Sequence, residues 1–367
     1  MRWISSVVIF ATLFVLSPGT KADTAPSLRQ PHPLGWMHAT PVGETPGWKS
    51  DYWINFELGW SNIWNAPHTM TDTRNGNTLE YFADYEQVSA ILELGGAISK
   101  RLSLAVEIPH AYRSGGDLDS LIDNFHVLLG NRRFNRHFYP EDQYNYSVQT
   151  NGVEYYEDQD RLATVANVKP KLKYWAAKWE NKKCPCGLAF SVQGKIPVQD
   201  EKYAGTTGDV DIYALMHLGI PLGRNSAMWF TGAYSYLGDN PAFDEWPRNK
   251  NYIMYELAID ANFARNWSIG LMARAESPYL DVDHLQYEDP SSSPSVVSRN
   301  RAASGWNSLV RWRGSNGLGL NYYTDKGSQI GFWIAEDWGI GPYDASDDIY
   351  SNGAPDINFV LQTSFGF

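Results

Sequence analysis

The chain has 367 residues, a formal net charge of −11 and 14% aromatic residues, among them 15 Trp and 22 Tyr. Its two cysteines exclude a disulfide-rich scaffold, and its acidic balance excludes a generic nucleic-acid binder. The mean hydropathy of −0.40 resembles that of a soluble protein. It fits a transmembrane β-barrel equally well, because apolar and polar residues alternate along such strands and average out.

The N-terminus has the form of a secretory signal peptide. Arg2 supplies a positive charge, residues 4–16 form an apolar run, and Thr20-Lys21-Ala22 offers small residues ahead of a cleavage site before Asp23. The apolar run is too short for a membrane-spanning helix. We therefore expect residues 1–22 to be removed on export. Residues 23–50 are predicted to be a periplasmic segment, and residues 51–367 a barrel.

Alternation with a period of two dominates the remainder of the chain. Between Asp51 and Trp64, apolar residues at every second position alternate with mostly polar ones, as in a strand with one apolar face. Short and long connections also alternate, which is typical of outer-membrane barrels. The sequence thus predicts an all-β fold, a transmembrane antiparallel barrel of about twelve strands, with a soluble β-sandwich as the alternative. The predicted strands are residues 51–64, 88–98, 102–108, 168–176, 188–196, 210–220, 227–237, 253–263, 267–275, 306–312, 318–324 and 357–367.

Connections and aromatic residues complete the predicted barrel. Residues 314–316 are expected to form a short turn, and residues 62–84 and 325–355 to form long external loops. The C-terminal Phe367 resembles the signal by which the barrel-assembly machinery recognises its substrates. That machinery, outer-membrane lipid and lipopolysaccharide are the expected partners, together with a small solute. Six tryptophans beside the short turns predict an aromatic girdle: Trp175, Trp179, Trp229, Trp267, Trp306 and Trp312.

One segment has a helical period instead. Apolar residues of 117–130 recur at offsets of three, four and seven, so we expect a short helix in a long external loop. Asp119, Asp123 and His126 can share its polar stripe. A carboxylate–imidazole cluster of this kind can bind a divalent metal or perform acid–base chemistry. The favoured interpretation is structural, with Asp123 orienting His126.

These residues also carry a family resemblance. The segment from Ser114 to His126, the preceding Glu107-Ile108-Pro109 and the early Gln30-Pro31-His32-Pro33-Leu34 resemble the hallmark motifs of the domain-of-unknown-function 3187 family of bacterial exported proteins. The resemblance covers about residues 30–150. Leu129-Gly130-Asn131-Arg132-Arg133 departs from the turn that is usual in the family. The resemblance implies an outer-membrane barrel and no particular activity.

The polar face of the strands predicts a charged lumen. Register places Lys195 near Asp209 or Asp211, and Glu256 near Arg274. The like-charged row of Lys169, Lys171 and Lys173 needs carboxylates such as Glu107, or an anionic solute, and neutralisation by carboxylates is favoured. Twelve strands predict a narrow, partly plugged pore. The predicted lumen charges are Glu57, Glu93, Glu107, Lys169, Lys171, Lys173, Lys195, Asp209, Asp211, Glu256 and Arg274.

The remaining motifs favour a protein without catalytic activity. Cys184-Pro185-Cys186 is expected to form a disulfide in an oxidising compartment, with free thiols or a metal site as alternatives. No nucleotide-binding or hydrolase motif is present, so no cofactor is expected. The leading hypothesis is a narrow channel or a structural envelope protein capped by the helix at 117–130. The alternatives are a lipid- or lipopolysaccharide-modifying enzyme that uses His126 with Asp119 or Asp123, and a surface adhesion module.

Overall fold

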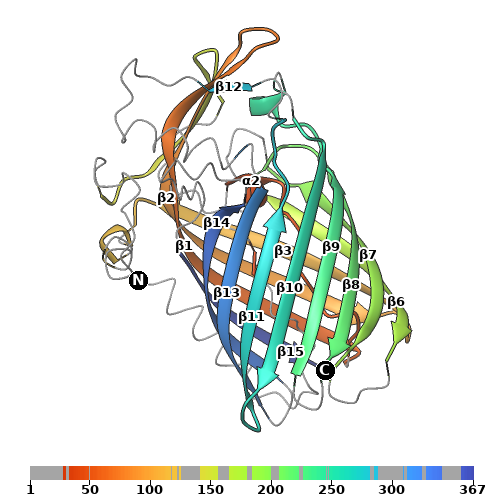
Figure 1. Ribbon diagram of the computed structural model, residues 1–367. Helices are drawn as coiled ribbons and strands as arrows, with labels where there is room; N and C mark the ends of the chain where they lie inside the picture. Colours follow the sequence, from red (N-terminus) through yellow and green to blue (C-terminus); the bar gives the residue numbers. More distant parts are fainter. Residues whose placement is uncertain are drawn as a thin grey trace.

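The computed structural model is a closed antiparallel β-barrel (Figure 1). It describes residues 28–29, 33–48, 50–116, 118–121, 124, 141–155, 165–179, 184–199, 206–222, 226–244, 246, 248–281, 285–287, 309, 312–324, 328–340 and 357–367. Wall strands pair in chain order, and β1 closes the ring by pairing with both β2 and β15. The predicted fold class is therefore confirmed. The twelve wall strands are β1 (Tyr52–Asp72), β2 (Thr78–Ala97), β3 (Leu102–Ser114), β6 (Asn167–Lys178), β7 (Gly187–Pro197), β8 (Asp211–Pro221), β9 (Ser226–Tyr236), β10 (Asn251–Asn262), β11 (Trp267–Glu276), β13 (Trp312–Tyr323), β14 (Gln329–Ile340) and β15 (Ile357–Gly366).

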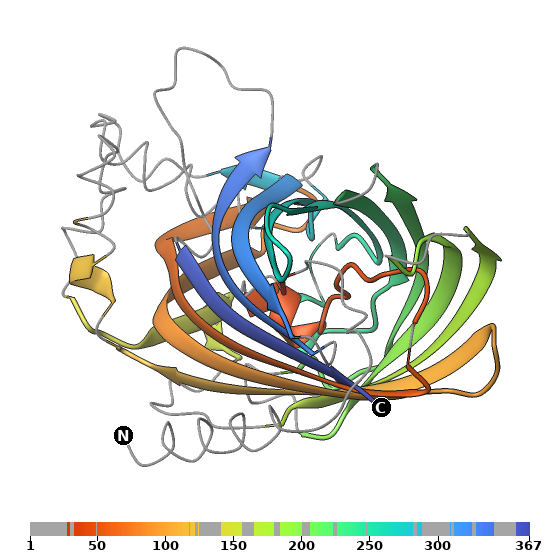
Figure 2. The same ribbon diagram turned by 90° about the horizontal axis from the view of Figure 1, so that it is seen from below.

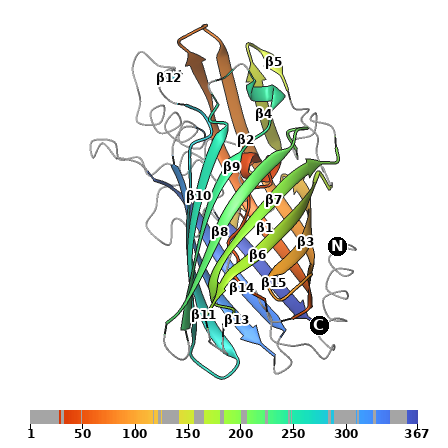
Figure 3. The ribbon, with the colours of Figure 1, turned by 90° about the vertical axis from the view of Figure 1, so that its right-hand side faces the viewer.

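The two ends of the barrel differ. At one end, which holds the C-terminus, short segments such as residues 98–101 and 263–266 join the strands, and we call it the turn end. At the opposite, loop end, β1 and β2 continue beyond the wall and are joined only by residues 73–77, so the predicted loop at 62–84 is mostly strand. Three short strands extend this hairpin (Figure 3): β12 (Leu285–Tyr287) lies beside β1, β4 (Asn145–Thr150) beside β2, and β5 (Val153–Glu154) beside β4.

The alternating sequence pattern becomes an alternation between the outside and the inside of the barrel. In β1, Tyr52 and Trp60 are 65% and 42% exposed, whereas Trp53 and Ser61 are 8% and 1% exposed. An apolar outer surface around a polar interior is what a strand wall in lipid requires. Among the described residues, no helix has the length and apolar character to cross a membrane.

One stretch of the wall differs from the prediction. Residues 314–316 do not turn, because β13 runs through them without a break, and β14 lies within the predicted loop at 325–355. Two predicted strands thus correspond to one, and one strand was missed. Residues 306–308 and 310–311 lie outside the described residues. The strand count of twelve is unaffected.

Two glycines of the neighbouring strands β11 and β13 make room for an aromatic ring. Gly319 of β13 pairs with Trp333 of β14, and Gly270 of β11 pairs with Gly319. A Cβ atom on either glycine would lie 2.2 Å from the fully buried indole of Trp333. Glycine in a strand interior often marks such a close approach rather than a turn.

The predicted aromatic girdle is only partly present. Trp179 and Trp267 are 39% and 40% exposed, but Trp175 and Trp229 are each only 7% exposed. The indole of Trp175 packs inside the barrel against Trp48, with 5.5 Å between ring centroids. Trp306 lies outside the described residues.

A buried apolar cluster lies in the interior toward the loop end. It includes Tyr146, Tyr213, Tyr252 and Phe243, the last from the 3-10 turn η2 (Pro241–Phe243). Met37 from the N-terminal part of the chain belongs to the same cluster. The predicted signal peptide, residues 1–22, lies outside the described residues.

Candidate functional site

The lumen is occupied by the N-terminal part of the chain. The described residues 28–29 and 33–48, which include the short helix α2 (Pro33–Met37), lie inside the ring of strands (Figure 2). We call them the N-terminal segment. Arg29, Met37 and His38 are 4%, 0% and 1% exposed. The prediction of a periplasmic segment at 23–50 is therefore wrong for these residues. Their polar groups bond to charges of the lumen wall, and this accounts for their place inside the barrel.

Glu44 anchors the segment to the lysine row of β6. Its carboxylate forms ion pairs with Lys171 and Lys173, with 2.9 Å between Lys173 Nζ and Glu44 Oε2. Lys171 also pairs with Glu93 of β2. Burial by itself raises the pKa of the Glu44 carboxyl, but the two lysines outweigh it and hold that pKa well below its usual range.

A second anchor lies beside the first. Arg29 forms an ion pair with Glu107 of β3 and donates a hydrogen bond to the carbonyl oxygen of Thr40. Lys169 Nζ lies 3.0 Å from Glu107 Oε1. Each lysine of the row at 169, 171 and 173 thus meets a carboxylate, and one of these carboxylates comes from the N-terminal segment.

A third anchor holds the segment near the loop end. His38 Nδ1 lies 3.1 Å from Asp211 Oδ2, and its Nε2 lies 3.1 Å from the Tyr279 hydroxyl. The same Asp211 oxygen is 3.0 Å from Lys195 Nζ. Burial lowers the pKa of His38, even though the neighbouring Asp211 acts to raise it. His38 therefore docks most favourably as the neutral imidazole.

On the opposite wall, Arg274 links the segment to two carboxylates. Its Nη1 lies 3.4 Å from Glu256 Oε2, and it also pairs with Glu276. Its Nη2 lies 3.4 Å from the Thr40 hydroxyl oxygen. Glu256 and Arg274 face each other in the register of β10 and β11.

Glu57 and Asp209 have other surroundings. Glu57 accepts a hydrogen bond from Gln362 Nε2 at 2.9 Å and lines a cavity of about 110 Å³ between the segment and β1, β2 and β15. Glu93, Glu107 and Lys173 line the same cavity. Asp209 is not in the lumen. It is exposed in the connection before β8, where it accepts a hydrogen bond from the Asp239 amide, and Asp211 alone meets Lys195.

The predicted helix cluster is described only in part. Residues 119–121 and 124 are helical, and Asp119 is buried. Its carboxylate accepts hydrogen bonds from Asn62 Nδ2 and from the Asp142 amide, so it ties the loop to the barrel. Asp123 and His126 lie outside the described residues. No group of three or more potential metal ligands occurs in the described parts of the chain.

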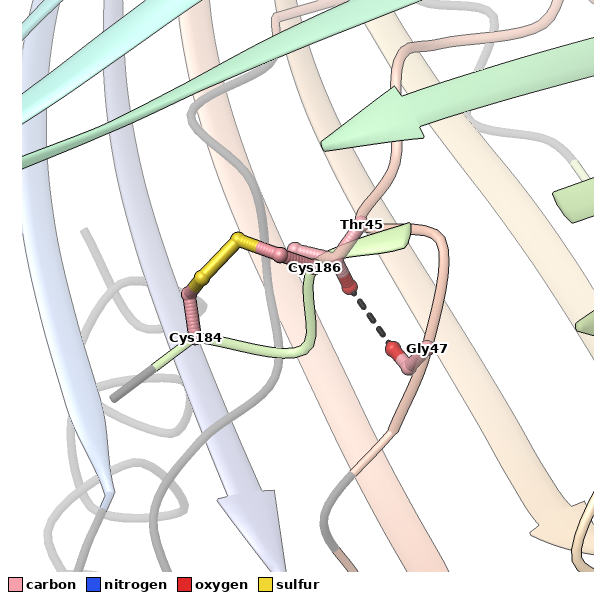
Figure 4. Close-up of a disulfide and its surroundings, with 4 residues drawn as sticks. All are labelled: Thr45, Gly47, Cys184 and Cys186. Carbon is pink, nitrogen blue, oxygen red and sulfur yellow. Dashed lines mark hydrogen bonds between the residues drawn. A yellow bond between two sulfur atoms is a disulfide. The ribbon is translucent and has the colours of Figure 1, made fainter. Parts of the chain in front are cut away.

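Cys184 and Cys186 form a disulfide at the turn end, beside the N-terminal segment (Figure 4). The Gly47 amide donates a hydrogen bond to the Pro185 carbonyl oxygen at 3.1 Å, and the Thr45 hydroxyl donates one to the Gly47 carbonyl oxygen at 3.0 Å. A Cβ atom on Gly47 would lie 2.2 Å from the Trp175 ring. The disulfide-bonded turn and this indole thus hold the last part of the segment.

Sequence reasoning missed three residues of the site, Arg29, His38 and Glu44. They lie in a stretch without strand or helix period, and their partners are far away in the chain. One signal was available. The lysine row of β6 needed carboxylates, and Glu44 is the single acidic residue between positions 24 and 50.

The comparisons with known proteins agree with this architecture. The chain matches the family described as protein of unknown function (DUF3187) over residues 49–280, more than half of its length. It belongs to the DUF3187 family. This confirms the resemblance seen in the sequence motifs. No curated protein matches the chain.

Solved structures share the barrel fold. The COG4313 outer membrane channel from Pseudomonas putida F1 is similar over 89% of this chain and 98% of its own, with a TM-score of 0.52 at 9% identity. A Pseudomonas aeruginosa FadL homologue covers 94% of this chain and 100% of its own, with a TM-score of 0.40 at 10% identity. For the COG4313 channel, at 9% identity, the similarity is one of fold.

Proposed function

We propose that this protein is a non-enzymatic channel of the outer membrane whose pore is closed by its own N-terminal segment. The observation that carries the proposal is a closed twelve-stranded wall with a charged lumen, filled by a segment that is not part of the wall. Barrels of about eight strands fill their interior with their own side chains, whereas a wider wall leaves room for such a segment.

The chemistry of the contacts supports reversible closure. Arg29, His38 and Glu44 bind the wall through ion pairs and hydrogen bonds. Water and ions can replace these polar contacts when the segment leaves, and Met37 then leaves the apolar cluster of the barrel interior.

Placement in the membrane is part of the same proposal. Outward-facing apolar side chains would contact outer-membrane lipid, and the loop end would face lipopolysaccharide. Phe367 pairs with Tyr52 at the closing seam, where the Phe367 amide donates to the Tyr52 carbonyl oxygen at 2.9 Å. Its side chain is 44% exposed, which suits recognition by the barrel-assembly machinery.

Planar-bilayer recordings test the proposal. The full-length mature chain should show rare, brief openings, and a variant that lacks residues 28–48 should conduct for most of the recording. Heat-modifiable migration in gels establishes that both barrels are folded. Absence of conductance in a folded deletion variant would overturn the proposal.

A further inference from the structure

We propose that Lys171 and Lys173 form a binding site for the carboxylate of a small polar solute, and that Glu44 occupies this site in the closed state. The inference deepens the proposed channel function, since Glu44 would act as a built-in substitute for the solute. It concerns binding, which can be measured without a pore.

The occupant of the site is a carboxylate held by two cations. One oxygen of Glu44 pairs with Lys171 and the other with Lys173. The two lysines are two residues apart on β6, so both side chains point into the lumen from the same face. Each carboxylate oxygen thus has its own charged donor, an arrangement that favours planar carboxylates.

Lys173 depends on the N-terminal segment for its partners in the described structure. Its Nζ lies 2.9 Å from Glu44 Oε2 and 3.2 Å from the Thr45 carbonyl oxygen. Lys171, in contrast, also pairs with Glu93 of the wall. Departure of the segment therefore leaves the Lys173 ammonium, 8% exposed while the segment is docked, facing the lumen without either of these acceptors. Such a cation is a strong attractor for an anion.

A hydroxyl group of the wall, that of Thr231, positions the Glu44 backbone beside the lysines. The Glu44 amide donates to the Thr231 hydroxyl oxygen at 3.4 Å, and His217 Nδ1 lies 3.1 Å from the same oxygen. His217 Nε2 in turn lies 2.8 Å from the Ser191 hydroxyl. These contacts hold Thr231 in place when Glu44 is absent.

The lining of the adjacent cavity indicates the chemistry of the rest of the solute, beyond its carboxylate. It has room for a small molecule, about 110 Å³, and its lining includes the polar side chains of Asn55, Gln362 and Ser364. A solute that carries a hydroxyl group can form hydrogen bonds with these side chains. Glu57, Glu93 and Glu107 also line the cavity and would repel a phosphate dianion more strongly than a singly charged carboxylate. The chemical class is therefore a small polar monocarboxylate.

Titration calorimetry on the mature chain in detergent micelles tests the site. The probe is sodium L-lactate, and its neutral isostere lactamide is the matched control ligand. Glu44→Ala removes the occupant and leaves space for the probe. We expect lactate to bind this variant at least about tenfold more tightly than the unaltered protein, because two charge-assisted bonds become available to it. Lactamide should not bind measurably.

Two further variants, each in the Glu44→Ala background, locate the site. Lys173→Met should weaken lactate binding by about tenfold or more. Lys178→Met should leave it unchanged, since Lys178 lies on the same strand but is exposed. Heat-modifiable migration shows that each barrel is folded. Equal lactate affinity with and without Glu44, lactate binding that survives Lys173→Met, or phosphate binding as tight as that of lactate would overturn the assignment.

Different experimental outcomes would refute the channel and the carboxylate site. A folded deletion variant without conductance would refute the channel, although lactate could still bind in micelles. A conducting deletion variant combined with no lactate binding to Glu44→Ala would refute the carboxylate site alone.

Discussion

Closure by the N-terminal segment makes a quantitative prediction for the Glu44–Lys173 ion pair. Removing one partner of a buried pair costs about 3–5 kcal/mol. The value should be smaller here, because 17% of the Glu44 side chain is exposed and Lys171 keeps Glu93 as a partner. For Glu44→Gln we expect about 2 kcal/mol, which lowers the ratio of closed to open time about 30-fold.

A double-mutant cycle in single-channel recordings checks this reasoning. Glu44→Gln and Lys173→Gln should each favour the open state. The double variant should be less open than the sum of the two effects implies, because neither charge is then left alone. A coupling energy of about 1 kcal/mol or more is expected for groups in direct contact. Effects that add within about 0.5 kcal/mol would show that the pair does not hold the segment in place.

Two further predictions concern pH and the wall. Because burial lowers the pKa of His38, the released segment, with a histidine pKa of about 6.5, binds protons more readily than the docked one. Docking should therefore weaken as the pH falls below about 6.5, so openings become more frequent, and His38→Gln should remove this trend in recordings at about pH 7.5 and 5.5. An identical response of both proteins would contradict the assignment. Gly319→Val, which places a Cβ atom 2.2 Å from the Trp333 ring, should destabilise the barrel by about 3 kcal/mol or more, measured as a lower urea midpoint. Gly194→Ala is the control, since its nearest neighbours are 3.8 Å away, and an equal shift in both variants would refute the packing argument.

Local patterns in the sequence predicted most of the barrel wall. Alternation along β1 predicted which side chains face outward, because successive residues of a strand point to opposite faces. Register between neighbouring strands similarly pointed to the pairing of Glu256 with Arg274, which lie 3.4 Å apart. The exception is the predicted turn at Gly314-Ser315-Asn316, whose residues are common in turns but lie within β13.

The sequence by itself determined the barrel, because strand periodicity, connection lengths and the family motifs are all local in the chain. Only the tertiary structure decided what fills it. Glu44 meets Lys173 across 129 residues, and His38 meets Asp211 across 173. Such pairs follow from the enclosure of a charged lumen, in which buried cations and carboxylates must find partners. No pattern within residues 23–50 records that requirement, so this segment appeared to be a periplasmic extension until the wall around it was complete.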